Sequence, residues 1–257
     1  MPGVVARVRH ALLLTIIPLL TSLGGTASAG DAYVLALSWQ PAFCVDHAAA
    51  PECQAAATEP PRLVLHGLWP DWDVNGDGKR NGEDDFCLAN PANRRMIEGL
   101  DAKARNAGTW RLLPAVSMSD ATVNDLKNAM PGALAGLDRH EWWKHGTCSG
   151  LTADVYFAVA IALTRETERG SLARLLVANA GKALPRNALL AAFEQDFGPK
   201  SARALLLDCD RSGATLQEIR IRLKRATVAQ GLTADTLAIP AKAPHGDCEA
   251  EINIPDL

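Results

Sequence analysis

The chain has 257 residues, 48% of them apolar, with 26 Lys and Arg against 29 Asp and Glu. This length and apolar content suffice for a hydrophobic core, so the composition excludes an intrinsically disordered protein and allows one large domain or two small ones. The formal net charge of −3 argues against a protein that holds nucleic acid through a broad basic surface, although it is compatible with a small basic site.

Residues 1–29 have the features of a secretory signal peptide. Arg7 and Arg9 precede an almost wholly apolar run over residues 11–20, and a small-x-small cleavage pattern ends at Ala29. A membrane anchor is the alternative, but the run is shorter than the roughly 20 residues that span a bilayer. We therefore predict an exported, periplasmic or secreted protein that is not held at a membrane after cleavage and that has lost two positive charges.

The chain contains six cysteines, all after this segment. In an oxidising compartment an even number predicts three disulfides. Fifteen pairings are possible, and the spacing favours only the short loop between Cys44 and Cys53. A zinc cluster is the competing interpretation, but the cysteines are dispersed and form no C-x-x-C pair.

The first half of the mature chain contains two predicted strands and a helix. Apolar residues alternate over 33–39, and a short apolar run over 62–66 ends at Gly67. A loop rich in Gly, Asn and Asp follows over about 71–85. A helix is predicted over 121–130, introduced by Ser119 or Asp120 and stopped by Pro131-Gly132.

The second half adds two helices and two strands. The first helix runs from the N-cap Thr152 to residue 168, and the second covers 188–197 with Pro185 in its first turn. Strands are predicted over 205–207 and 219–223. Helices and strands mix without a regular βαβ repeat, which indicates the α+β class. We find no repeat or linker, and we predict one domain over residues 30–257.

Three histidines lie in two short segments that are crowded with Trp, Lys and carboxylates. The segments are Leu65-His66-Gly67-Leu68-Trp69-Pro70-Asp71 and His140-Glu141-Trp142-Trp143-Lys144-His145-Gly146-Thr147-Cys148. The second segment is similar to the zinc motif H-E-x-x-H but is one residue longer. On a helix, five steps of about 100° place the two imidazoles some 140° apart, so they cannot chelate one ion from one helical face. A zinc hydrolase that recruits His66 stays open as an alternative.

Acid–base catalysis is the second interpretation. If the second segment is helical, Glu141 and His145 share a face with Lys144 at its edge, and His66 at the end of a strand can supply a second imidazole. Two imidazoles suit attack on a phosphodiester by a neighbouring hydroxyl, because one removes a proton and the other protonates the leaving oxygen. Lys144 would meet the developing negative charge. Such a reaction needs no metal, but it needs the ribose 2′-OH, which DNA lacks.

Both segments resemble the signature segments of the ribonuclease T2 family, and the resemblance covers most of residues 31–257. It implies an α+β fold built on a central antiparallel sheet. It also implies an endoribonuclease that cleaves single-stranded RNA with low base specificity, to 2′,3′-cyclic phosphates and then 3′-phosphates. No cofactor is implied for catalysis. We expect RNA and not DNA as substrate, and a monomer.

The resemblance assigns roles to the residues of both segments. It implies that His145 is the base and His66 the acid, that Glu141 and Lys144 stabilise the pentacovalent intermediate, and that His140 binds phosphate. If the segments had another purpose, His66 would be a strand-end histidine and His145 a surface residue. An inactive relative that binds RNA or a protein is a further alternative, which the presence of both histidines disfavours.

The resemblance also implies base contacts and two disulfides. Trp69 matches a position that stacks on a base, and Asp71 matches one that hydrogen-bonds to it, although Trp69 could equally serve packing. The implied disulfides are Cys87 to Cys148 and Cys209 to Cys248.

The loop over 73–84 departs from the family pattern. Its residues offer oxygen ligands at positions 1, 3, 5, 9 and 12 and a glycine at position 6, as in a calcium loop. Position 12 is an aspartate instead of the usual glutamate, and no flanking helix pair is evident. The candidate ligands of a structural calcium ion are Asp73, Asn75, Asp77 and Asp84, and the alternative is a solvated acidic turn.

Overall fold

The computed structural model describes residues 32–71, 85–240 and 246–257. The predicted signal peptide and the candidate calcium ligands therefore lie outside the described residues, and so does Trp72. The elements up to residue 148 are β1 (Ala32–Trp39), α1 (Gln40–Asp46), α2 (Pro51–Ala56), β2 (Leu63–Asp71), α3 (Pro91–Asn106), η1 (Trp110–Leu112), α4 (Asp120–Ala129), η2 (Pro131–Ala135), α5 (Leu137–Lys144) and η3 (Gly146–Cys148). The later elements are α6 (Ala153–Glu168), α7 (Ser171–Ala178), β3 (Lys182–Pro185), α8 (Arg186–Phe197), η4 (Ser201–Ala204), β4 (Leu205–Cys209), β5 (Leu216–Lys224), η5 (Arg225–Gln230) and β6 (Glu251–Ile254).

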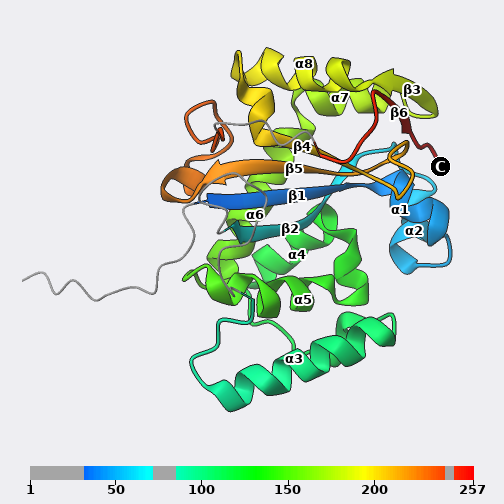
Figure 1. Cartoon of the computed structure of the whole chain (residues 1–257). Coiled ribbons are helices and arrows are strands. Elements are labelled where there is room, and N and C mark those ends of the chain that lie inside the picture. The colour runs from blue at the N-terminus through cyan, green and yellow to red at the C-terminus, as the bar shows by residue number, and fades with distance from the viewer. Residues whose placement is uncertain (1–31, 72–84, 241–245) are drawn as a thin grey trace, which may run out of the picture.

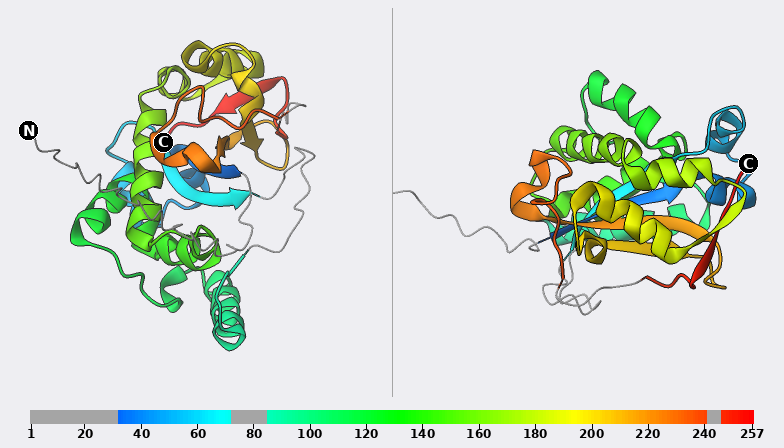
Figure 2. Two further views of the ribbon diagram at one scale, coloured as in Figure 1. Left: turned by 90° about the vertical axis from the view of Figure 1, so that its left-hand side faces the viewer. Right: turned by 90° about the horizontal axis from the view of Figure 1, so that it is seen from above.

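Four strands form a sheet in the order β2-β1-β5-β4, and each neighbouring pair is antiparallel. Helices α7 and α8 lie beyond its β4 edge, while α4 and α5 lie beyond its β2 edge (Figure 1). Helix α3 projects furthest from the sheet, at the bottom of Figure 1 and of the left view of Figure 2. Strands β3 and β6 form a separate two-stranded sheet. The predicted antiparallel α+β architecture is confirmed.

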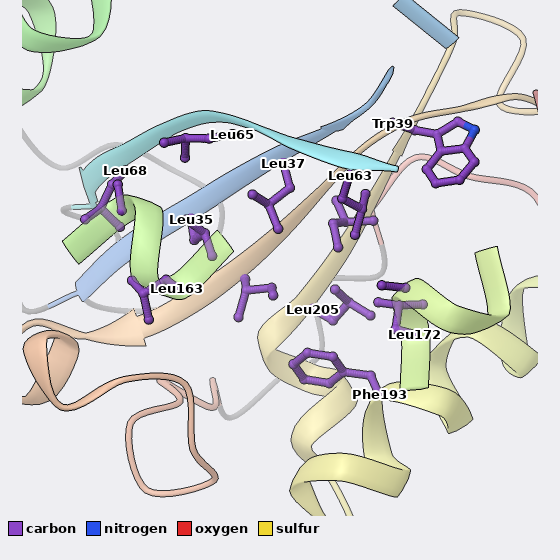
Figure 3. Close-up of a cluster of buried hydrophobic side chains, with 14 of the residues drawn as sticks. Leu35, Leu37, Trp39, Leu63, Leu65, Leu68, Leu163, Leu172, Phe193 and Leu205 are labelled. Carbon is purple, nitrogen blue, oxygen red and sulfur yellow. The ribbon is translucent and has the colours of Figure 1, made fainter. Parts of the chain in front are cut away.

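One face of the sheet belongs to the hydrophobic core. Strand residues of one parity, such as Leu35 and Ile221, are buried and lie opposite each other in the register. Side chains from the helices complete the cluster, among them Leu163 of α6 and Phe193 of α8 (Figure 3). Burial of this apolar surface is the main source of stability for the fold.

The other face of β5 is charged. Between its buried apolar residues, Glu218, Arg220 and Arg222 occupy the alternate positions. Because successive residues of a strand point to opposite faces, these three side chains share one face. The site described below is built on that face.

A β-bulge in β2 positions the first histidine. The register pairs Ala36 with Gly67 and then Leu37 with Leu65, so His66 is the extra residue. A bulge shifts the alternation of side chains by one position. Leu65 and Leu68 therefore both belong to the core, although they are an odd number of positions apart, three, in the strand. The prediction that the strand ends at His66 is wrong: pairing continues to Asp71, which brings Trp69 into the strand.

The predicted helices are present with small shifts. Helix α4 begins after the N-cap Ser119, and α6 begins after the N-cap Thr152, whose hydroxyl accepts a hydrogen bond from Val155 N–H. Pro185 was expected inside the first turn of α8, but it is the last residue of β3 and the N-cap of the helix. Its fixed φ suits the extended backbone of both positions.

Three disulfides join the elements, and they are the pairs expected from the sequence and the resemblance: Cys44 with Cys53, Cys87 with Cys148 and Cys209 with Cys248. The bond from Cys87 to Cys148 attaches the segment before α3 to the end of the second histidine segment. Within the described residues no single helix is long and apolar enough to cross a membrane; the sharply bent pair Leu137–Cys148 and Ala153–Glu168 meets these criteria only when its two parts are taken together.

Candidate active site

The short helix α5 carries most of the site. It begins after Gly136, whose φ of 87° is in the left-handed region that glycine adopts readily, and it ends at Lys144. His140 and Glu141 point into the protein and are buried. His145 is the C-cap of the helix and not a helical residue, which corrects the assumption that the whole segment is helical.

Strand β2 brings two further side chains against this helix. The Trp69 indole Nε1 donates a hydrogen bond of 2.7 Å to Oε2 of Glu141, and Nε2 of His66 lies 3.7 Å from Oε1. The Trp69 ring contacts both imidazoles, with centroid distances of 5.2 Å to His66 and 5.4 Å to His145. The structure therefore brings together the histidines of both sequence segments.

Each of the three imidazoles has a carboxylate at its Nδ1 atom. The pairs are His66 with Glu218 at 2.5 Å, His140 with Asp101 at 2.5 Å and His145 with Asp85 at 3.3 Å. A carboxylate at Nδ1 fixes the orientation of the ring and leaves Nε2 as the nitrogen that can meet a substrate. No sequence motif marks these three acids.

Glu141 lies at the centre of the imidazole cluster. Its Oε1 atom is 3.7 Å from Nε2 of His66 and 3.9 Å from Nε2 of His140, and it has no hydrogen-bond partner among the described residues. The residue is completely buried. A buried carboxylate in this position stabilises positive charge on either imidazole, and its unused oxygen faces the space between them.

The pKa values of the two candidate catalytic histidines are shifted in opposite directions. Burial lowers the pKa of His145, and the neighbouring Asp85 offsets this only in part. Burial also acts to lower the pKa of His66, but its hydrogen bond to Glu218 and the charges of Glu218 and Glu141 outweigh this and raise the pKa above its ordinary value. His145 is therefore the better base and His66 the better acid near neutral pH.

Lys144 and the base-contact candidates lie around this cluster. The Lys144 Nζ atom is 4.0 Å from Asp85 Oδ2 and is partly exposed. Arg220 lies over the ring of Trp69 at 5.3 Å from its centroid. Asp71 forms an ion pair of 2.8 Å with Arg222, so its carboxylate is already engaged, and its contact with a base stays a prediction.

His140 is fixed on two sides. Asp101 of α3 is buried, and its carboxylate accepts a hydrogen bond from Nδ1 of His140. Trp110 of η1 stacks on the imidazole with a centroid distance of 4.0 Å. No motif marks either partner. The one available signal was an aspartate among polar helix positions, which is too common to interpret.

Gly67 lies where any side chain would disturb the centre of the site. A Cβ atom at this position would overlap with Oε2 of Glu141 and with the Trp69 indole. We expect Gly67→Ala to lower kcat about 100-fold or more, because displacing a catalytic group by an ångström has an effect of this size. Kinetics on an RNA substrate measure the effect.

Gly99→Ala is the matched control for this variant, because a Cβ atom on Gly99 of α3 meets nothing within 4 Å. We expect unchanged kcat and a gain in unfolding free energy of about 0.5–1 kcal/mol from helix propensity. Equal activity of the Gly67 variant and the wild type would contradict the assigned geometry.

The ion pair of Asp101 and His140 predicts a pH-dependent stability. Burial acts to raise the pKa of the Asp101 carboxyl, but the hydrogen bond and charge of His140 outweigh it and lower the pKa. A lowered folded-state pKa stabilises the fold above the unfolded pKa of about 3.9, and this contribution disappears as the pH falls through the folded pKa.

We therefore expect Asp101→Asn to lower the unfolding free energy at pH 7 by about 1–3 kcal/mol. The difference from the wild type should shrink when urea unfolding is measured near pH 3. Asp235→Asn, at an exposed site, should have little effect at either pH. A difference that is equally large at both pH values would show that the charge of Asp101 does not stabilise the fold.

His140, Glu141 and His145 also form the one candidate metal cluster within the described residues. One ligand atom of each lies within 4.8 Å of the others. The two imidazoles do not lie on one helix, because α5 ends before His145, so the angular separation expected for a continuous helix does not keep them from a common ion. The three donors have the chemistry of a zinc site, so a metal-dependent reaction requires a direct test.

The sequence model of the ribonuclease T2 family matches residues 30–232, and the chain belongs to this family. The family match defines the chain as a T2-type endoribonuclease. The resemblance of the two histidine segments is thereby confirmed. The comparisons do not support a structural calcium ion, and the predicted loop lies outside the described residues.

Relatives in bacteria and plants show the extent of the match. The chain is 30% identical over 228 residues to Ribonuclease I of Escherichia coli strain K12, which covers 85% of this chain and 83% of the relative. It is 24% identical to Ribonuclease 1 of Arabidopsis thaliana over 252 residues, 95% of either chain. The fold is similar to that of ribonuclease MC1 from the seeds of bitter gourd, with a TM-score of 0.51 and 19% identity over 87% of this chain and 99% of that one.

Proposed function

We propose that this protein cleaves single-stranded RNA, with low base specificity and without a metal ion, by transesterification through the ribose 2′-OH. The observation that carries the proposal is the pair of imidazoles with opposite pKa displacements, His145 lowered and His66 raised, beside Lys144 and the buried Glu141. Family membership supports the ribonuclease activity. The roles of the individual residues are our assignment.

In the first step, the 2′ oxygen forms a bond to phosphorus while the bond from phosphorus to the 5′ oxygen of the next nucleotide breaks. His145 takes the proton of the 2′-OH, and Nε2 of His66 gives its proton to the leaving 5′ oxygen. Lys144 stabilises the negative charge that develops on the phosphoryl oxygens. Glu141 supports the charged imidazoles, and His140 binds the phosphate. The product is a 2′,3′-cyclic phosphate.

In the second step, water opens the cyclic phosphate with the roles exchanged. His66 takes a proton from the attacking water, the bond from phosphorus to the 2′ oxygen breaks, and His145 returns its proton to that oxygen. The product is a 3′-phosphate, and both imidazoles regain their starting states. The first step needs neutral His145 and protonated His66, so the rate should rise with pH through the pKa of His145 and fall through that of His66.

A largely apolar cavity of about 260 Å³ adjoins the half-buried imidazole of His66 and the buried imidazole of His140. Phe43, Trp110 and Leu137 are among its lining residues, together with His66 and His140. Aromatic and aliphatic walls accept the flat faces of all four bases, which is consistent with low base specificity. Since the chain has a net negative charge, affinity must come from this local site.

The setting proposed for this activity is an oxidising compartment outside the cytoplasm. Three disulfides support export, and so does the sequence pattern of residues 1–29. We propose that the mature protein acts as a monomer that remains free of the membrane after cleavage of the signal peptide.

The direct test is incubation of the mature protein with RNA and with DNA in EDTA. We expect cleavage of RNA only. A metal hydrolase is the second candidate, which the cluster of His140, Glu141 and His145 favours. Loss of RNA cleavage in EDTA and its recovery with zinc would support that candidate, while binding of RNA without cleavage would indicate an inactive relative.

A further inference from the structure

The charged face of β5 carries a carboxylate that exchanges no proton in the proposed reaction. We infer that Glu218 is a positioning residue for His66: it holds the imidazole through Nδ1 and keeps Nε2 directed at the leaving oxygen. This inference rests on the proposed function, because it assigns Glu218 a task in the acid half of that reaction.

The geometry of the pair supports this role. Strand β5 places Glu218 opposite Ser38 of β1, and its Oε2 atom lies 2.5 Å from Nδ1 of His66. The Glu218 side chain is 9% exposed, whereas that of His66 is 34% exposed. An ionised carboxylate only accepts hydrogen bonds, so Nδ1 carries the proton in both charge states of the ring. Proton exchange is thereby confined to Nε2, which faces the site.

Glu218 is itself held in place and kept ionised. Its second oxygen, Oε1, accepts a hydrogen bond of 2.7 Å from Nε of Arg220, and Arg220 also forms an ion pair with Asp208 of β4. Both oxygens are therefore engaged, which prevents rotation of the carboxylate. Burial acts to raise the pKa of Glu218, but His66 and Arg220 outweigh it and lower the pKa. The sheet thus forms a chain of charges from Asp208 to His66.

The charged groups that face His66 have opposite effects. Glu218 of β5 and Glu141 of α5 stabilise the imidazolium, while Arg220 of β5 disfavours it. If Glu218 positions His66 through charge and hydrogen bonding, removing the acid and removing the neighbouring Arg220 should shift the pH midpoint of His66 in opposite directions. Glu218→Gln should lower the pH midpoint of His66, and Arg220→Gln should raise it. A purely structural role would not produce opposite shifts.

The first experiment needs no activity. The mature protein is labelled with ¹⁵N-histidine, the His66 signals are assigned by comparison with His66→Ala, and the ring is titrated by NMR. We expect a midpoint lower by about 1 pH unit in Glu218→Gln and higher by about half a unit in Arg220→Gln. Glu218→Asp keeps the charge and should largely retain the wild-type midpoint. Glu251→Gln, at an exposed site in β6, is the control and should leave it unchanged.

The second experiment measures the pH profile of RNA cleavage. In Glu218→Gln we expect kcat to fall about 10- to 100-fold with KM within about twofold, and the falling alkaline limb to move to lower pH by the shift that NMR gives. An unchanged His66 midpoint in Glu218→Gln, or shifts of both variants in the same direction, would overturn the inference. Failure of the proposed function has a different signature: the wild type would not cleave RNA in EDTA.

Discussion

Replacing His145 by alanine is expected to lower kcat for RNA cleavage by about 10³- to 10⁴-fold, because a positioned base contributes that much to a proton-transfer step. The residue is 4% exposed and lies just beyond the end of α5, so its ring is held in one place. The low pKa that burial gives it keeps the imidazole neutral near pH 7. Single-turnover kinetics on a short RNA measure the effect without interference from product release.

His47→Ala is the matched control for this variant. His47 is exposed and is not one of the proposed catalytic groups, although it stacks on Phe43 of the cavity lining, so its loss should leave kcat unchanged. Circular dichroism and thermal unfolding should show that His145→Ala retains the fold. Activity of this variant within tenfold of the wild type would mean that another group removes the 2′-OH proton.

Lys144→Ala is expected to lower kcat by about 10²- to 10³-fold with little change in KM. Its side chain is 23% exposed, and its ammonium lies near the proposed phosphate position, where negative charge grows as the transition state forms. An interaction that is stronger in the transition state than in the ground state appears in kcat and not in KM. Steady-state kinetics over a range of RNA concentrations separate the two quantities.

Lys127→Ala removes a similar ammonium from the exposed surface of α4 and should change neither constant. Lys144→Arg keeps the charge but alters its geometry, so we expect an intermediate kcat. If Lys144→Ala raised KM and left kcat unchanged, the lysine would bind RNA without stabilising the transition state.

The sequence predicted those elements whose signals are local. Helix α6 has the N-cap Thr152, an apolar periodicity and the terminal Gly170, and β5 alternates apolar and charged residues. Helix α3 was not predicted, although Asn90 is its N-cap and Pro91 is its first residue. Its sequence is strongly polar and buries few side chains, so the periodic signal is weak.

The site was predictable in its motif residues and not in their partners. His66, Glu141, Lys144 and His145 lie in two segments of unusual composition. Glu218 lies 152 residues from His66, and only the antiparallel order of the strands brings the two together. The bulge at His66 also could not be predicted from the sequence, because strand register depends on pairing with another strand.

The charged partners explain how a protein with net negative charge can hold a reactive anion. Glu218 at Nδ1 stabilises positive charge on the His66 imidazole, and protonated His66 together with Lys144 supplies the cationic groups of the proposed site, whereas His145 stays neutral. The acids lie behind the rings, whereas the Nε2 atoms of His66 and His140 face Glu141 in the site. In the proposed function, local arrangement and not net charge therefore determines binding of the phosphodiester.

Cleavage of a dinucleoside monophosphate in EDTA, followed by ³¹P NMR, tests the central claim most directly. The proposed mechanism predicts that a 2′,3′-cyclic phosphate accumulates first and converts to a 3′-phosphate, while the 2′-deoxy analogue remains intact. Formation of a 5′-phosphate, cleavage of the deoxy analogue, or activity only after addition of a metal ion would contradict it.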